Sequence, residues 1–233
     1  MFLCGINLNC QEWEFFMDTY ADSPYYRKFT DAIELHDGSI VVNSPFVLPI
    51  EDHSGLPHPG LVKLSADGDE LVRSNYFRPA YCSISYNQIL VNEDGELFAL
   101  MTYSPDHERL SDNYFKNFDN PPANAILGLY KLDDKLNIIE SYEHFIPIDT
   151  TERMVGYDPI LDKMPNLNHG CLYLFTSFVD NSSDIVGSFF KCPTFHSPYQ
   201  TENDTLFFFK MNFEGEILNM KGVECLGGNG DFY

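Results

Sequence analysis

Short apolar runs alternate with tight polar turns along this chain. The segment GLVKLSADGDELV, residues 60–72, has an apolar run, an acidic turn that contains Asp67 and Gly68, and a second apolar run. Glycine accepts the positive φ that hairpin turns require, so this pattern predicts a β-hairpin. Similar segments return at residues 129–139 and 208–218, which indicates that one hairpin is repeated three times.

The three copies align on a lysine inside the first apolar run, at Lys63, Lys131 and Lys210. The third copy turns at Glu214-Gly215, with the same chemistry as the first. The middle copy turns at residues 134–137 without a glycine and is the weakest match. Because apolar residues flank each lysine, we expect the aliphatic stems to lie along a sheet with the ammonium groups at its edge.

A second hairpin precedes each of these copies, with turns at Asp37-Gly38, Asp94-Gly95 and His169-Gly170. A continuous apolar run follows each glycine, at residues 40–42, 97–100 and 172–175. Strands that are apolar on both faces are buried on both faces. The repeating unit is therefore two hairpins, or four antiparallel strands, with a period near 70 residues.

Repeats of four short strands are typical of β-propeller blades, which bury their faces by stacking on one another. The outer strands align at 70–77, 137–145 and 216–224, and EWEFFMDTY at 12–20 matches them. We therefore expect an all-β fold, a propeller-like radial stack of three four-stranded antiparallel blades, open or forming a half-ring. The expected limits are a single domain over 12–233, with blades at roughly 12–64, 65–132 and 133–211 and a last outer strand at 216–224.

DAIELHDGSIVV at 31–42, followed by GLVKLSADGDELV, resembles the repeat of secreted bacterial β-propeller proteins, in which an AIELSDGGYIV hairpin precedes a GLIKLDSNGNLLW hairpin. The resemblance runs from Trp13 to Glu224 and implies a fold, not an activity. Val72 and Arg73 stand where the family has an aromatic residue. Three blades are also fewer than the four to eight of closed propellers. The resemblance thus implies a fragment of a longer propeller, or a homodimer that completes a six-bladed ring.

The charge of the chain narrows the choice of partners. It has 35 acidic and 14 basic residues, a formal net charge of -21. Such a surface repels phosphate backbones and anionic membranes, which argues against nucleic acid as a partner and against adsorption to a membrane. No apolar stretch approaches the length of a membrane helix, so membrane insertion is not expected. No CxxC pair or other metal-binding or cofactor motif is present, so we expect no cofactor and no metal.

The first residues, MFLCGINLNCQ at 1–11, resemble the end of a secretory signal without its basic region. This predicts an extracytoplasmic protein, periplasmic or secreted, in which residue 1 lies inside a longer signal peptide. If the start is genuine, the prediction is a cytoplasmic protein.

Three long connections, at 44–59, 104–124 and 179–204, are expected at the end of the blades opposite the tight turns. Loops on a rigid scaffold are where binding residues usually lie. The candidate ligand-binding residues in them are Asp52, His53, Asp106, His107, His196 and Tyr199. A carbohydrate or a protein is the ligand that such polar and aromatic side chains suit.

The sequence therefore favours a non-catalytic binding or scaffold module that engages its ligand through the long loops. The alternative is a carbohydrate-active hydrolase or lyase that uses acidic and histidine residues on the same face. Asp31, Glu34, Asp94 and Glu96 are carboxylates on or beside the inner hairpins that could flank a glycosidic bond. A third possibility is a truncated gene product without independent function.

Overall fold

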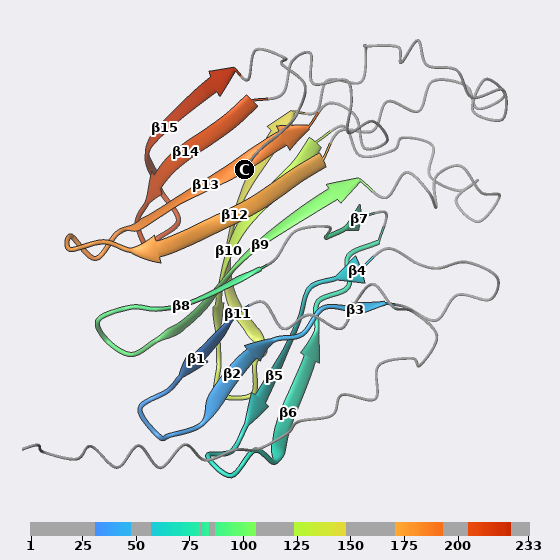
Figure 1. Cartoon of the computed structure of the whole chain (residues 1–233), viewed down its shortest axis with the longest axis vertical. Coiled ribbons are helices and arrows are strands. Elements are labelled where there is room, and N and C mark those ends of the chain that lie inside the picture. The colour runs from blue at the N-terminus through green and yellow to red at the C-terminus, as the bar shows by residue number, and fades with distance from the viewer. Residues whose placement is uncertain are drawn as a thin grey trace, which may run out of the picture.

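The computed structural model describes residues 31–47, 57–79, 81–83, 87–105, 124–147, 171–192 and 205–224 (Figure 1). These residues form strands joined by turns and short irregular segments, and none of them belongs to a helix that could cross a membrane. The all-β prediction is confirmed. The outer strand expected at 12–20 lies outside the described residues.

The described strands form three antiparallel sheets, which we call blades 1, 2 and 3. Blade 1 has the order β1 (Ala32–Glu34), β2 (Ile40–Asn43), β5 (Gly60–Leu64) and β6 (Glu70–Asn75). Blade 2 has β8 (Gln88–Val91), β9 (Leu97–Pro105), β10 (Asn124–Leu132) and β11 (Ile138–Pro147). Blade 3 has β12 (Cys171–Val179), β13 (Ile185–Cys192), β14 (Thr205–Met211) and β15 (Ile217–Glu224).

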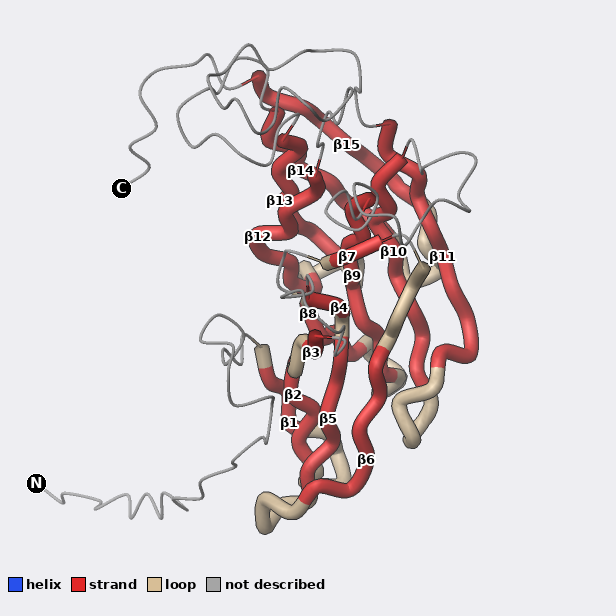
Figure 2. The backbone as a smooth tube through the Cα atoms, turned by 90° about the vertical axis from the view of Figure 1, so that its right-hand side faces the viewer, coloured by secondary structure: helices blue, strands red, loops and turns tan. Residues whose placement is uncertain are grey.

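Two smaller pairings complete the described architecture. The short strand β7 (Tyr81–Cys82) pairs with the end of β9, and β3 (Phe46–Val47) pairs with β4 (Pro57–His58). The three blades follow one another along the long axis of the molecule as an open stack (Figures 1 and 2). The propeller-like architecture expected from the repeat is therefore present, without closure into a ring.

Each sheet begins with its first hairpin and ends with its outer strand. β6 pairs with β5, β11 with β10 and β15 with β14, so an outer strand belongs to the hairpin that precedes it. The sheets thus span 32–75, 88–147 and 171–224. The expected limits 12–64, 65–132 and 133–211 instead assign each outer strand to the blade that follows it, whereas in the described sheets β6, β11 and β15 pair with the strand before them.

Six tight turns join consecutive strands within the blades, and all six have the same hydrogen-bond pattern. The N–H of the first residue donates to the carbonyl of the fifth, and the N–H of the fourth donates to the carbonyl of the first. The turns are 35–39, 65–69, 92–96, 133–137, 180–184 and 212–216. The fourth residue has a positive φ every time, and it is Gly38, Gly68, Gly95, Leu136, Ser183 or Gly215.

The first turn of blade 3 differs from the sequence-based prediction. The hairpin expected at His169-Gly170 is wrong as the first turn of this blade, because β12 and β13 are joined by the turn at 180–184. The expected loop at 179–204 is likewise interrupted by β13. The turn escaped recognition because Ser183, with a φ of 60°, stands where the other blades have glycine. Asp180 supports the turn by accepting hydrogen bonds from the N–H groups of Ser182 and Asp184.

We predict that Ser183→Gly relieves about 0.5–1 kcal/mol of backbone strain, a gain that is reduced by loss of the hydrogen bond from the Ser183 hydroxyl to Glu93. The left-handed conformation costs a residue with a side chain roughly 1–2 kcal/mol, whereas glycine costs roughly 0.5–1 kcal/mol in chain entropy. Ser182→Gly is the matched control, since Ser182 has no positive φ and the change should only destabilise. Urea unfolding followed by circular dichroism measures both. Equal effects of the two changes would contradict the strained turn.

The faces of the blades explain how the stack is held together. Residues paired across the ladders lie on the same face, so alignment on the three lysines gives equivalent positions in each blade. We call the face toward the next blade along the chain the forward face and the opposite face the rear face. Forward positions are Ile33, Val41, Leu61 and Tyr76 in blade 1, and Leu90, Phe98, Leu129 and His144 in blade 2. Rear positions are Leu97, Ala99, Tyr130 and Leu132 in blade 2, and Ile185, Gly187, Phe209 and Met211 in blade 3.

Two hydrophobic clusters lie where a forward face meets a rear face. One joins Val41 and Leu61 of blade 1 to Ala99 and Leu132 of blade 2, and all four are buried. The other joins the forward residues of blade 2 to Leu172, Leu174, Ile185, Phe189, Phe209 and Met211 of blade 3. Stacking therefore buries the apolar surface that one blade could not bury alone.

Hydrogen bonds add a second connection between neighbouring blades. The Tyr76 hydroxyl donates to the Leu136 carbonyl at 2.7 Å, and the His144 Nε2 lies 2.8 Å from the Gly215 carbonyl oxygen. Tyr76 and His144 occupy equivalent forward positions, and both carbonyls belong to the positive-φ residue of the next blade's second turn. Each outer strand thus binds a turn of the following blade. The equivalent residue in blade 3 is Val223, which is exposed.

Candidate functional site

The six residues predicted to bind a ligand are Asp52, His53, Asp106, His107, His196 and Tyr199, and they lie outside the described residues. Their prediction therefore stays a prediction. The strands that flank their loops are described: β2, β9 and β13 end, and β5, β10 and β14 begin, at the end of the blades opposite the tight turns. The scaffold thus directs all three loops from the same end.

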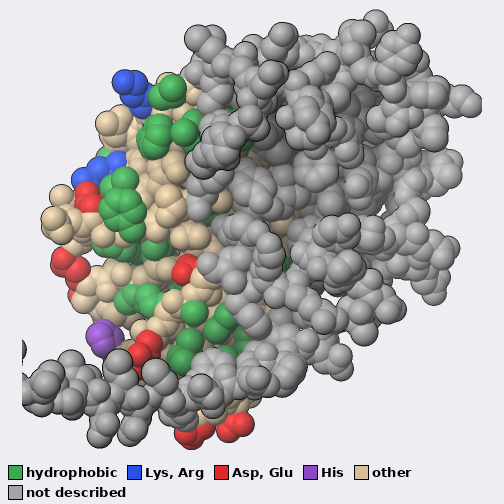
Figure 3. Space-filling view, viewed as in Figure 1, with side chains coloured by type: hydrophobic (Ala, Val, Ile, Leu, Met, Phe, Trp, Pro, Cys, Tyr) green, Lys and Arg blue, Asp and Glu red, His purple; other side chains and the backbone are tan. Residues whose placement is uncertain are grey.

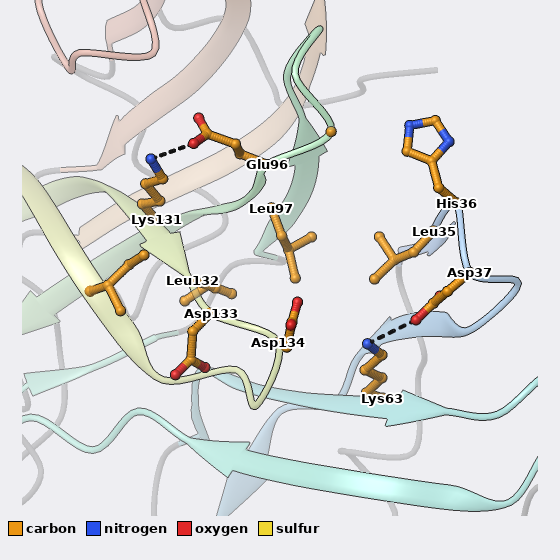
Figure 4. A pocket seen from close by; sticks show the side chains of 12 residues that line it. Leu35, His36, Asp37, Lys63, Glu96, Leu97, Lys131, Leu132, Asp133 and Asp134 are labelled. Atoms are coloured by element: carbon orange, nitrogen blue, oxygen red, sulfur yellow. Dashed lines mark hydrogen bonds and ion pairs between the residues drawn. The ribbon is translucent and has the colours of Figure 1, made fainter.

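At the opposite end, a cleft of about 400 Å³ lies between the tight turns of blades 1 and 2 (Figure 4). Blade 1 contributes Leu35, Asp37 and Lys63, and blade 2 contributes Glu96, Lys131 and Asp133. The cleft has an apolar floor of leucine side chains with charged groups around it. All of the residues that line this cleft belong to the described part of the chain.

On the blade 1 side, Lys63 lies 3.4 Å from the Asp37 carboxylate. Asp37 also accepts hydrogen bonds from the N–H and the hydroxyl of Ser39. These hydrogen bonds, helped by the charge of Lys63, lower the pKa of Asp37 from 3.8 to about 2. The carboxylate is therefore ionised at neutral pH and cannot serve as a proton donor there.

We predict that Ser39→Ala raises the pKa of Asp37 toward its ordinary value, because the Ser39 side chain supplies the largest share of the shift. A carboxyl with a lowered pKa stabilises the folded state above its unfolded pKa, near pH 4, and this contribution is lost as the pH falls through about 2. Carbon-detected NMR titration of Asp37 in wild type and variant measures the shift. A wild-type midpoint near 4 would contradict the prediction.

On the blade 2 side, Lys131 makes two ion pairs, with Glu96 at 2.7 Å and with Glu140 at 3.7 Å. Hydrogen bonds from Lys131 and Asn92 lower the pKa of Glu96. The hydrogen bond to Glu96 raises the pKa of Lys131. Both groups are thus charged at neutral pH and form an ion pair with each other.

Blade 3 repeats the arrangement, with Lys210 2.9 Å from both Asp180 and Asp184. In all three blades the aligned lysine reaches back to a carboxylate in the preceding hairpin turn. The position of the carboxylate within the turn varies between blades, but the position of the lysine in its strand is the same in all three. The lysines therefore link the two hairpins of each blade, which agrees with the structural role expected from their apolar flanks.

Asp133 also has a structural role, in the second turn of blade 2. Its carboxylate accepts hydrogen bonds from the N–H groups of Lys135 and Asn137 and from the Asn137 side chain. The hydrogen bonds from Asn137 lower the pKa of Asp133. The pKa values of Asp37, Glu96 and Asp133 are thus all lowered, so these three carboxylates are ionised at neutral pH and are not suited to act as general acids there.

The carboxylates considered for glycosidic chemistry are not gathered in one place. Asp31 accepts a hydrogen bond from the Ile89 N–H at 2.7 Å and so ties blade 1 to β8. Glu34 and Asp94 are exposed on β1 and on a turn. Of the four, Glu96 alone lines the cleft, and it is paired with Lys131.

A second polar cluster lies where blades 1 and 2 meet. Arg78 forms an ion pair with Glu143 at 2.6 Å, and its guanidinium lies 5.2 Å and 5.7 Å from the ring centres of Tyr81 and Tyr103. The Tyr130 hydroxyl donates to Glu143 at 2.9 Å. Burial raises the pKa of Tyr103 and of Tyr130, so both stay protonated. The sequence gives no signal for this cluster, because its members come from separate segments with no common spacing.

Within the described ranges, no group of three or more histidine, cysteine or acidic side chains is arranged to hold a metal ion. Comparisons with protein-family models and with curated proteins find no match. Among solved structures, the chain is similar to a protein of unknown function from Bacteroides caccae, with 10% identity and a TM-score of 0.22. That match covers 86% of this chain and 69% of the other. At this level the similarity carries no argument about fold or activity.

Proposed function

We propose that this chain is a non-catalytic binding or scaffold module of an extracytoplasmic β-propeller. The observation that carries the proposal is the lysine–carboxylate pair found in all three blades. Catalytic groups are expected in one place in a protein. An ion pair that recurs at the equivalent position of every blade is better explained by a structural role. In the cleft, the pairs Lys63–Asp37 and Lys131–Glu96 thereby connect the two hairpins of their blades.

In this proposal the ligand, a carbohydrate or a protein, binds the loops at the end opposite the tight turns. Loops carried by a rigid sheet scaffold are common binding surfaces, because the frame holds their ends in fixed positions. The candidate contacts are those predicted from the sequence, with His53 and His107 following an aspartate in two successive loops. The propeller family and the extracytoplasmic location remain part of the same proposal.

The carbohydrate form of the proposal can be tested by affinity electrophoresis through gels that contain neutral and acidic polysaccharides. We expect at least one polysaccharide to retard the wild type, and the double variant His53→Ala, His107→Ala to lose this retardation. His36→Ala is the matched control, since His36 is exposed in a tight turn at the other end. Retardation that survives the double variant would contradict a long-loop site.

The same polysaccharides test the hydrolase and lyase alternative. A binding module releases no reducing or unsaturated ends from a polysaccharide that it retains. Release of such ends by the wild type, abolished by Asp52→Asn or Asp106→Asn, would overturn the non-catalytic proposal. In that case the long-loop carboxylates would act as the acid and base of the reaction.

A further inference from the structure

We propose that the forward face of blade 3 is the interface of a two-fold homodimer. Three large apolar side chains on this face are exposed: Phe178 by 55%, Phe208 by 50% and Val223 by 46%. They come from β12, β14 and β15, and the half-buried Val186 and Leu206 lie among them. An exposed apolar patch that spans a whole sheet is typical of an interaction surface.

The strand register shows that these are stacking positions. Phe178 is equivalent to Ile33 and Leu90, because each pairs with the residue opposite the aligned lysine. Phe208 is likewise equivalent to Leu61 and Leu129, two residues before that lysine. In blades 1 and 2 these positions pack in the hydrophobic clusters against the next blade. Blade 3 has the same apolar pattern with no described sheet against it.

The charge of the face also fits an interface. Its ladder rows contain Lys210, Asn219, Thr176, Ser188 and Lys221 besides the apolar residues, and no aspartate or glutamate. The acidic residues nearest to these rows are Asp180 and Asp184, which pair with Lys210 at the turn end of the face. Depletion of charged residues at the centre is typical of protein–protein interfaces. Figure 3 shows hydrophobic and basic side chains next to each other on the side of the molecule where blade 3 lies, with an acidic side chain beside them.

A second copy is the occupant that these observations favour, with both copies using blade 3. A six-bladed ring of two chains would instead need the rear face of blade 1, where Val42, Val62 and Leu64 would receive the partner. These three residues are 6%, 0% and 1% exposed and are therefore already covered. Within the described sheets, the forward face of blade 3 is thus the stacking face that is open. A two-fold dimer in which this face meets its own copy covers both and leaves no further surface to extend the assembly.

The size of the face sets the expected affinity. Four strands about 4.8 Å apart, about eight residues long at about 3.3 Å per residue, cover roughly 500 Å². Two copies would bury about 1,000 Å² in total, at the lower limit for a specific interface. Both copies have a net charge of -21, which opposes association and is screened by salt. We therefore expect a concentration-dependent dimer that becomes tighter as the salt concentration rises.

Sedimentation velocity of the full chain over a concentration series at low and high salt tests the proposal. We expect a monomer–dimer equilibrium in the wild type and a monomer for Phe208→Asp over the same series. Phe145→Asp is the matched control, because Phe145 is 56% exposed on β11 of blade 2 and should leave the dimer intact. Circular dichroism confirms that both variants are folded. A wild type that is monomeric throughout, or a Phe208→Asp variant that still dimerises, would overturn the proposal.

One further variant separates the two-fold dimer from a ring. Ala32 is exposed on the rear face of blade 1, directly opposite Val42 in the ladder. Ala32→Arg would disrupt a ring and should leave the blade 3 dimer unchanged. Loss of the dimer in this variant would overturn the two-fold arrangement. The experiment does not involve the long loops, so its failure is distinct from failure of the proposed ligand binding.

Discussion

Replacing Phe189 by alanine is expected to lower the free energy of unfolding by about 3–5 kcal/mol. Phe189 is fully buried in the cluster that joins blade 3 to blade 2. Its ring is stacked on Phe207, with 5.0 Å between ring centres and 14° between ring planes. The substitution removes apolar surface from the contact between two sheets and leaves a cavity that backbone strands on both sides cannot easily fill.

Phe208→Ala is the matched control for this prediction. Phe208 lies in the neighbouring strand of the same blade, but on the forward face, where it is half exposed. At a protein concentration where the chain is monomeric, its truncation should cost less than about 1 kcal/mol. Urea unfolding at fixed concentration compares the two. Similar losses for Phe189→Ala and Phe208→Ala would contradict the assignment of one buried and one open face to blade 3.

Gly60→Ala is expected to destabilise the protein by about 2–3 kcal/mol. Gly60 begins β5, and an added Cβ would come closer than 3.0 Å to the backbone carbonyl oxygen of Ser44. The Ser44 N–H also donates to the Gly60 carbonyl at 2.8 Å, so the two segments are held together at this point. Because the contact is with backbone, a side-chain rotation cannot relieve it, and β2 and β5 must separate.

Gly222→Ala is the control for the glycine prediction. A Cβ at Gly222 would lie 3.0 Å from side-chain atoms of Thr205 and Phe207, which can adjust, and the residue is exposed on β15. We expect a change within about 0.5 kcal/mol. Thermal and urea unfolding of both variants gives the comparison. A Gly60→Ala protein as stable as the wild type would contradict the close approach of β2 and β5.

Turn chemistry allowed most of the described fold to be predicted. Four of the six hairpin turns contain a glycine at the positive-φ position, and these were recognised from Asp-Gly or Glu-Gly pairs. Leu136 was found only by alignment with its neighbours. The turn at Ser183 cannot be predicted, because a positive φ at serine leaves no signal in the sequence. For this reason the expected first hairpin of blade 3 lies about one strand before the observed one.

The site was less predictable than the fold. The lysines were found by alignment, but their carboxylate partners lie 26 residues before Lys63 and 30 before Lys210, since the intervening loops differ in length. The turn position of the carboxylate also differs between blades. The apolar pattern of the forward faces follows the lysine register and could be predicted. The sequence does not predict which of these faces is exposed, because exposure depends on what packs against the blade.

The contact between the rings of Phe98 and Phe213 tests the stacking of the blades most directly. Phe98 lies on the forward face of blade 2 and Phe213 in the second turn of blade 3, with ring centres 4.7 Å apart. Nuclear Overhauser spectroscopy on protein labelled at phenylalanine should show cross-peaks between these two rings, and they should disappear in Phe213→Leu. Absence of the cross-peaks in a folded sample would contradict a stack in which the forward face of each blade covers the rear face of the next.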